Sequence, residues 1–271
     1  MNFMQTMYHA ISKATRLLAI SGILFLASCK KDHSDEPAPA PETVKLREYT
    51  DGDDFIKFQY DAGGILKKAT VKNEISTSGT IVDFDISYGA GNKISELNSS
   101  AGEKIVPVYE NGILKRADNF VAGERTGYTN YQFEGGNIKR ATIYKKEDDD
   151  YTPILEFIYT YNNSGNVSEG VIMVGTDTPG EMVRYGHAAM QYDQKTNPLY
   201  AYKDFLVLIW EGVSKNNIAV EDVYDAQLVL QDRYTYSYTY KSNGLPEKAD
   251  VQIGLPGQPS ANSSVGFAYQ Q

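Results

Sequence analysis

The chain has 271 residues, a formal net charge of −9 at pH 7 and one cysteine. The acidic balance argues against nucleic acid and against electrostatic binding to an anionic membrane surface. A single cysteine excludes a disulfide within one chain. Hydrophobic residues make up 41% of the sequence and aromatic residues 12%, including 21 tyrosines, which is enough apolar surface for a folded core.

The first 28 residues have the organisation of an export signal. Lys13 and Arg16 carry their only charges, and the apolar run over residues 17–26 is too short to span a bilayer as a mature helix. The sequence LASC at 26–29 resembles the lipobox of bacterial lipoproteins, which implies cleavage before Cys29 and acylation of its thiol. The alternatives are an ordinary secretory signal with an incidental cysteine, or a buried structural cysteine.

Residues 29–43 are predicted to be a lipidated cysteine followed by a proline-rich tether. Alternating prolines and alanines favour extended polyproline II, which gives a reach of roughly 40 Å at about 3.1 Å per residue. The acidic residues soon after Cys29 resemble the loose signal that takes Bacteroidota lipoproteins to the cell surface: Asp32, Asp35 and Glu36. The predicted location is the outer membrane, through the lipid anchor, with the cell exterior as one candidate side.

Residues 44–271 are predicted to form one β domain. An aromatic residue, a turn rich in Asp, Asn and Gly, and an apolar restart recur along the chain, at Tyr60, Tyr88, Tyr109, Phe133, Tyr161 and Tyr240. These turn residues tolerate the positive φ of a tight hairpin, and the flanking segments alternate or are β-branched. The fold class expected is therefore all-β, an antiparallel meander of hairpin repeats forming a curved sheet or a barrel-like domain, with at most one short helix.

One segment interrupts the hairpin pattern. Asp204 could cap a short helix and Gly212 could end it, whereas the apolar run over residues 205–210 is also consistent with a buried strand. We expect the short helix, packed on the sheet. Trp210, the sole tryptophan of the sequence, is expected in the core in preference to a sugar-binding surface.

Adjacent basic residues follow three of the turns, at 67–68, 115–116 and 139–140. They suggest a basic binding stripe, but neighbouring residues of a regular strand point to opposite faces. We therefore interpret them as solvent-facing or edge residues that resist aggregation.

Several of these motifs carry a resemblance. The hairpin consensus is similar to the YD repeats of bacterial surface proteins, although the uneven spacing argues against their large closed shell. The patterns at 192–198, 214–217 and 238–246 resemble a family of Bacteroidota secreted lipoproteins without an assigned function. That resemblance implies a porin-like β fold and no particular activity.

The sequence has few groups suited to catalysis. His187 is the only histidine of residues 44–271, and no glycine-rich phosphate loop or nucleophile motif is present. Two acidic runs, 51–54 and 147–150, lack the spacing of a known calcium loop, so we expect them to be solvated. No cofactor and no metal site are predicted.

The strand RYTYSYTY at 233–240 places four tyrosines on one face. Such a face could bind sugars by stacking, with the ligand-facing candidates Tyr234, Tyr236, Tyr238 and Tyr240. The alternative is cross-strand packing.

Together these features favour a lipid-anchored, non-catalytic binding or interaction module at the outer membrane. Its expected partners are the membrane, through the anchor, and either a glycan or an outer-membrane protein, and no nucleic acid. The alternatives are a glycan-processing enzyme with dispersed carboxylates and a structural subunit of an outer-membrane complex.

Overall fold

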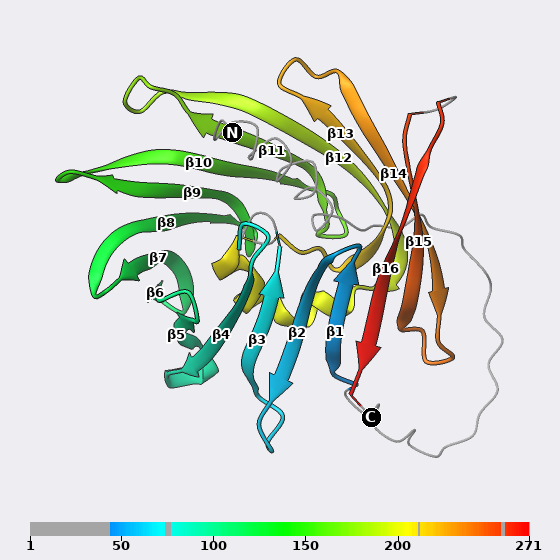
Figure 1. The fold of residues 1–271 in the computed structure, drawn as a ribbon, viewed down its shortest axis with the longest axis horizontal. Coiled ribbons are helices and arrows are strands. Elements are labelled where there is room, and N and C mark those ends of the chain that lie inside the picture. The colour runs from blue at the N-terminus through cyan, green and yellow to red at the C-terminus, as the bar shows by residue number, and fades with distance from the viewer. Residues whose placement is uncertain (1–43, 74–76, 211, 256–257, 271) are drawn as a thin grey trace.

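A computed structural model describes residues 44–73, 77–210, 212–255 and 258–270 of the chain (Figure 1). The predicted signal peptide, Cys29 and the tether lie outside these ranges.

Sixteen antiparallel strands follow one another around a closed barrel, in which β16 returns to pair with β1. The predicted all-β meander is therefore confirmed, in its barrel form. The strands are β1 (Leu46–Asp51), β2 (Asp54–Tyr60), β3 (Leu66–Lys72), β4 (Ile81–Tyr88), β5 (Ile94–Ser99), β6 (Glu103–Glu110), β7 (Ile113–Val121), β8 (Glu124–Glu134), β9 (Asn137–Glu147), β10 (Asp150–Tyr161), β11 (Val167–Gly175), β12 (Met182–Thr196), β13 (Asn216–Asp225), β14 (Leu230–Tyr240), β15 (Pro246–Ile253) and β16 (Ala261–Tyr269).

The six predicted hairpins lie at one end of the barrel, which we call the hairpin end. They join β2–β3, β4–β5, β6–β7, β8–β9, β10–β11 and β14–β15. The opposite end, which we call the loop end, holds the turns that join β1–β2 and the other pairs in between. The first strand begins at the hairpin end and the last strand finishes there.

A β-bulge follows every hairpin at the same place. Tyr60 pairs with Leu66 but Gln59 pairs with Lys68, so Lys67 is an extra residue in β3. The same shift occurs after the aromatic residue of each of the other five hairpins. A bulge of this kind bends and twists the strand, which assists closure of a barrel.

The structure contains two further copies of the unit that the sequence pattern does not reveal. Tyr192 pairs with Ile218 next to a bulge in β13, as the aromatic residue does in each hairpin. A long segment connects β12 to β13 where the other units have a tight turn. Tyr269 pairs with Leu46, so the eighth copy is made from the two ends of the barrel. The barrel thus consists of eight similar two-stranded units.

The bulge corrects the interpretation of the basic pairs. Lys67 and Lys68 do not point to opposite faces, because the extra residue leaves both on the outside between buried Leu66 and Ala69. The pattern of one buried residue, two outward residues and one buried residue recurs at 114–117. The prediction that these residues face solvent holds, while the reason given for it was wrong.

The inside of the barrel is mostly apolar, apart from buried carboxylates such as Glu221 and Asp51, and the outside is charged. Inward positions such as Ile56, Val71 and Leu97 are at most 2% exposed. Outward carboxylates meet cations on neighbouring strands, as in Lys68–Asp83 at 2.9 Å and Arg140–Glu156 at 2.6 Å. The hydrophobic core is therefore the filled lumen of the barrel.

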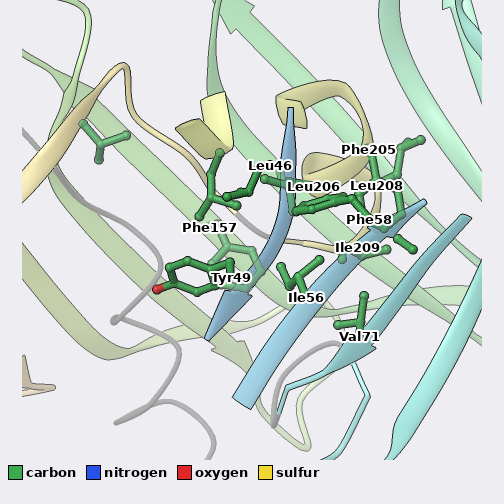
Figure 2. Packing of buried hydrophobic residues seen from close by; sticks show 14 of the residues in the cluster. Leu46, Tyr49, Ile56, Phe58, Val71, Phe157, Phe205, Leu206, Leu208 and Ile209 are labelled. Atoms are coloured by element: carbon green, nitrogen blue, oxygen red, sulfur yellow. The ribbon is translucent and has the colours of Figure 1, made fainter. Parts of the chain in front are cut away.

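A helical segment between β12 and β13 enters this lumen. It consists of η3 (Pro198–Tyr202), α2 (Lys203–Leu206) and η4 (Val207–Ile209), drawn in yellow inside the ring of strands in Figure 1. Its buried residues Phe205, Leu206 and Leu208 lie among core residues of β1 and β2 (Figure 2). The predicted short helix is confirmed, and the buried strand considered for the same residues is wrong.

Candidate functional site

The helical segment begins at a different cap from the one predicted. The side-chain oxygen of Asn197 accepts a hydrogen bond from the Leu199 amide at 3.0 Å, and Pro198 occupies the first helical position. Asp204 lies in the first turn of α2 without capping it. The segment ends at Trp210, which has a left-handed φ of 65°, and not at Gly212.

One side of the segment packs tightly on β1, β2 and β4. The Tyr202 ring stacks on Phe58 with centroids 4.2 Å apart, and Phe205 meets Phe84 edge-on at 6.0 Å. The Tyr202 hydroxyl also accepts a hydrogen bond from the Leu46 amide at 3.0 Å. These contacts fix the segment against the first strands of the barrel.

The two ends of the segment are held together by polar side chains. Asn166, which is fully buried, accepts hydrogen bonds from the Lys215 and Asn216 amides at 2.9 and 3.1 Å and donates to the Asn216 side chain at 2.9 Å. Asn197 donates to the Ser214 carbonyl at 3.2 Å. The motifs at 192–198 and 214–217 therefore serve to anchor this segment.

The third motif joins the same network. The Tyr240 hydroxyl donates to Asp193 and accepts a hydrogen bond from Asn217 at 3.1 Å. Burial raises the pKa of the Asp193 carboxyl, and the hydrogen bond from Tyr240 opposes that rise.

A cavity of about 490 Å³ lies on the other side of the segment, between it and strands β6 to β11. Its volume is in the range of small-molecule sites, about 300–1,000 Å³. Seven aromatic residues line it: Tyr109, Phe133, Phe157, Tyr159, Tyr161, Tyr200 and Trp210. Hairpin turns at Gly112, Gly136 and Gly165 border it, so it lies at the hairpin end.

Two of the polar groups on the wall already have protein partners. The Trp210 indole N–H donates to Thr129 Oγ1 at 3.1 Å, and the Tyr161 hydroxyl donates to the Ile138 carbonyl at 2.9 Å. Trp210 thus packs against the core, as predicted, and also forms part of the cavity wall. Because these two polar groups are paired, a ligand in the cavity would meet mainly ring faces and aliphatic carbons.

Among the described residues of the cavity wall, the charged groups are Lys93, Lys203 and Asp204, and all three are exposed. Lys93 Nζ lies 5.8 Å from the centroid of the Tyr109 ring, and Lys203 Nζ lies 4.9 Å from that of Tyr200. Burial, with the nearby Asp204 charge, raises the pKa of Tyr109 to about 12, so its hydroxyl stays protonated at neutral pH.

The four tyrosines of β14 face the barrel interior and line no part of this cavity. Tyr234 and Tyr236 are 2% and 8% exposed, and Tyr238 stacks between Tyr236 and Tyr240 at centroid distances of 6.4 and 5.7 Å. Their position supports the packing alternative, and ligand binding by them stays a prediction. No local sequence pattern indicates the cavity, because its wall is assembled from six strands and the helical segment.

Asp204 is the sole carboxylate among the described residues that line the cavity, and none of these residues is a histidine. Within the described ranges, no three His, Cys, Asp or Glu side chains are placed as metal ligands. His187 lies on the outer face beside Tyr224, with ring centroids 5.2 Å apart. The acidic runs 51–54 and 147–150 lie at the loop end, away from the cavity. Asp51 is the last residue of β1 and is only 8% exposed, so the prediction that this run is solvated is wrong for Asp51. Over the same ranges, no helix has the length and apolarity needed to cross a bilayer.

Comparison with solved structures supports the fold. A porin-like protein from Bacteroides uniformis ATCC 8492 is 12% identical, with a TM-score of 0.56 over 83% of this chain and 96% of its own. A porin-like protein from Bacteroides vulgatus ATCC 8482 is 15% identical, with a TM-score of 0.45 over 84% of this chain and 99% of its own. No family model and no curated protein matches the sequence. The porin-like architecture implied by the sequence motifs is therefore confirmed at the level of fold.

Proposed function

We propose that the protein is a lipid-anchored, non-catalytic binding module of the outer membrane that takes a small ligand into the aromatic cavity. The observation that carries this proposal is the cavity itself, because it is of ligand size and bordered by turns at an open end of the barrel. A core built only for stability would fill this space with side chains.

The position of the chain start supports a role close to the membrane. Leu46, the first residue of β1, lies at the hairpin end, so the described chain begins at the end where the cavity lies. A tether with a reach of roughly 40 Å would keep this end near the membrane that holds Cys29.

The arrangement of carboxylates favours binding over the enzyme alternative. Glycoside cleavage uses a pair of carboxylates across the scissile bond, whereas Asp204 is the sole carboxylate among the described residues that line the cavity. The role as a structural subunit would need an apolar surface for a partner. Leu228 and Val229, which are 51% and 55% exposed at the loop end, are where such a surface would begin.

A glycan is one candidate ligand, because sugar faces stack on tyrosine and tryptophan rings. Binding is tested with a chain lacking residues 1–29, by titrating short glycans and apolar probes while recording the emission of Trp210. We expect at least one class of ligand to change this emission saturably. A chain whose emission responds to neither class would contradict the proposed function.

The anchor is tested separately. Replacing Cys29 by Ser removes the thiol that would accept the lipid, so we expect loss of fatty-acid labelling and release of the protein from membranes. A Ser28→Ala variant, which keeps a small residue before the cysteine, should behave as the parent. Unchanged labelling of Cys29→Ser would refute the anchor.

A further inference from the structure

We infer that the ligand of the cavity is amphipathic, with an apolar body inside the barrel and one anionic head group at the mouth. This inference rests on the proposed function and specifies the class of ligand. Three features of the cavity support this inference: the apolar side chains of its wall, the hydrogen bonds that two of its polar groups already make to the protein, and the charged residues at its edge.

The inner wall is apolar on all the elements that form it. Phe157, Ala141 and Val167 from three different strands are at most 5% exposed, and Val207 and Trp210 close the cavity from the helical segment. A ligand body that meets these side chains gains by leaving water, at about 25 cal/mol for each Å² of apolar surface.

The same wall disfavours a sugar as the buried part. Each hydroxyl that leaves water without a new partner costs on the order of 1–3 kcal/mol. The Tyr161 hydroxyl and the Trp210 indole N–H both donate to protein acceptors, so neither donor is available to a sugar. Stacking on the rings could offset one such loss but not the several that a sugar would bring.

The mouth favours a negative charge. Lys93 and Lys203 line the cavity and, among the ion pairs of the described residues, neither takes part in any. Asp204 offsets one of the two positive charges, so the described residues of the mouth carry a net positive charge. A carboxylate or phosphate could contact a lysine ammonium there while its apolar chain occupies the interior.

Two sources could supply this chemistry: a free long-chain carboxylic acid, or the acyl chain and phosphate head of a membrane phospholipid. The two share an apolar body and an anionic head. The brominated probes below distinguish them.

Trp210 makes a direct test available, because it is the sole tryptophan and lines the cavity. Bromine quenches indole emission on contact, so bromododecanoate should quench Trp210 saturably in a chain lacking residues 1–29. Bromododecanol, which has the same body without the charge, should bind more weakly. Vesicles of phosphatidylethanolamine and phosphatidylglycerol with brominated acyl chains test the phospholipid source.

The charge is tested with Lys93→Gln/Lys203→Gln. Because exposed ion pairs contribute little, we expect bromododecanoate to bind roughly three- to tenfold more weakly to this variant, with bromododecanol unchanged. Lys241→Gln is the matched control, since Lys241 Nζ lies 4.9 Å from the Tyr269 ring in the same way but does not line the cavity. Its affinity for bromododecanoate should equal that of the parent.

The site is tested with Ala141→Phe, which places a ring into the cavity and should abolish quenching by both probes while the circular dichroism spectrum is retained. If that variant does not fold, Val213→Phe fills the same cavity from a half-buried position outside the strands. Quenching that persists in a folded variant would overturn the inference, as would equal affinity for the acid and the alcohol in the parent. If a glycan changes Trp210 emission and neither brominated probe does, the proposed function stands and this inference fails.

Discussion

At the scale of single residues, the buried amide of Asn166 has a larger role than its turn position suggests. The side chain joins β11 to the chain that leaves the helical segment, through hydrogen bonds to two backbone amides. Asn166 itself is 0% exposed, and its truncation would leave both amides without this acceptor.

We therefore expect Asn166→Ala to lower the free energy of unfolding by about 1–3 kcal/mol, because two part-buried amides lose their acceptor. Urea denaturation followed by circular dichroism measures it. Asn262→Ala is the control, because Asn262 is exposed on β16 and should change stability by less than about 0.5 kcal/mol. Equal effects of the two variants would refute the anchoring role of Asn166.

His187 gives the domain a pH dependence of known sign. Burial, with a smaller effect of Arg184, lowers the pKa of its imidazole below the ordinary value of 6.5. The unfolded chain then binds more protons than the folded chain near this pH, so stability is full at higher pH and falls as the pH drops below 6.5.

This dependence is measured on residues 44–271, where His187 is the only histidine. Its imidazole resonance should titrate with a midpoint below 6.5. The free energy of unfolding should decrease between pH 7.5 and pH 5 by more in the parent than in His187→Gln, roughly as linkage requires. A midpoint above the ordinary value would reverse the sign and contradict the burial of this ring.

At the scale of elements, the repeated bulge makes an unusual prediction about deletions. Glu247 is the extra residue in the bulge of β15. If it is deleted, Pro246 and Ala249 can still point inward, because one outward residue then separates them as in a regular strand. Asp250 lies in the regular part of the same strand, and its removal forces either Ala249 or Val251 to turn outward.

We expect the chain without Glu247 to fold and unfold cooperatively. The chain without Asp250 should be less stable by about 1.5–3 kcal/mol from Val251 alone. Each deletion removes one exposed acidic residue, so both change the net charge by the same amount. Urea unfolding curves of the two chains compare them, and the bulge would lose its proposed role if both deletions had the same effect.

Prediction from sequence succeeded for the hairpins because the information is local. Asp, Asn and Gly between aromatic and branched residues specify a turn within a few positions, as at Tyr60 and Tyr109. The bulge was missed because an alternation argument assumes a period of two, which one extra residue breaks. The cap at Asn197 is local and was missed in favour of Asp204, whereas the network of Asn166 joins residues distant in sequence, which a local pattern does not reveal.

At the scale of the whole molecule, the distribution of charge decides which solvent the barrel suits. Strict alternation along β3 predicts lysines on both faces of the strand. In the structure, Lys67, Lys68 and Lys72 all lie on the outside. A barrel in a membrane would present this outer wall to lipid. There each Lys or Arg near the midplane costs about 2–4 kcal/mol.

We therefore expect a chain lacking residues 1–29 to be monodisperse in buffer without detergent, with a circular dichroism spectrum dominated by β structure. Size-exclusion chromatography with light scattering measures this. The likeness to the porin-like structure concerns the fold alone, and this expectation rests on the charges of the outer wall. A chain that folds only in detergent micelles would show that the outer ion pairs, such as Lys68–Asp83, tolerate lipid.

Barrel closure also has a consequence for folding. The pair β1–β16 joins residues from the two ends of the domain, as in Leu46 with Tyr269, so no part of the nascent chain can complete the ring before the last strand has been synthesised. Contacts of such long sequence separation form slowly. Until then β1 and β15 have open edges, which are sites for pairing with other chains. Loss of the last few residues would leave these edges permanently exposed, and the protein would tend to aggregate although most of its hairpins were intact.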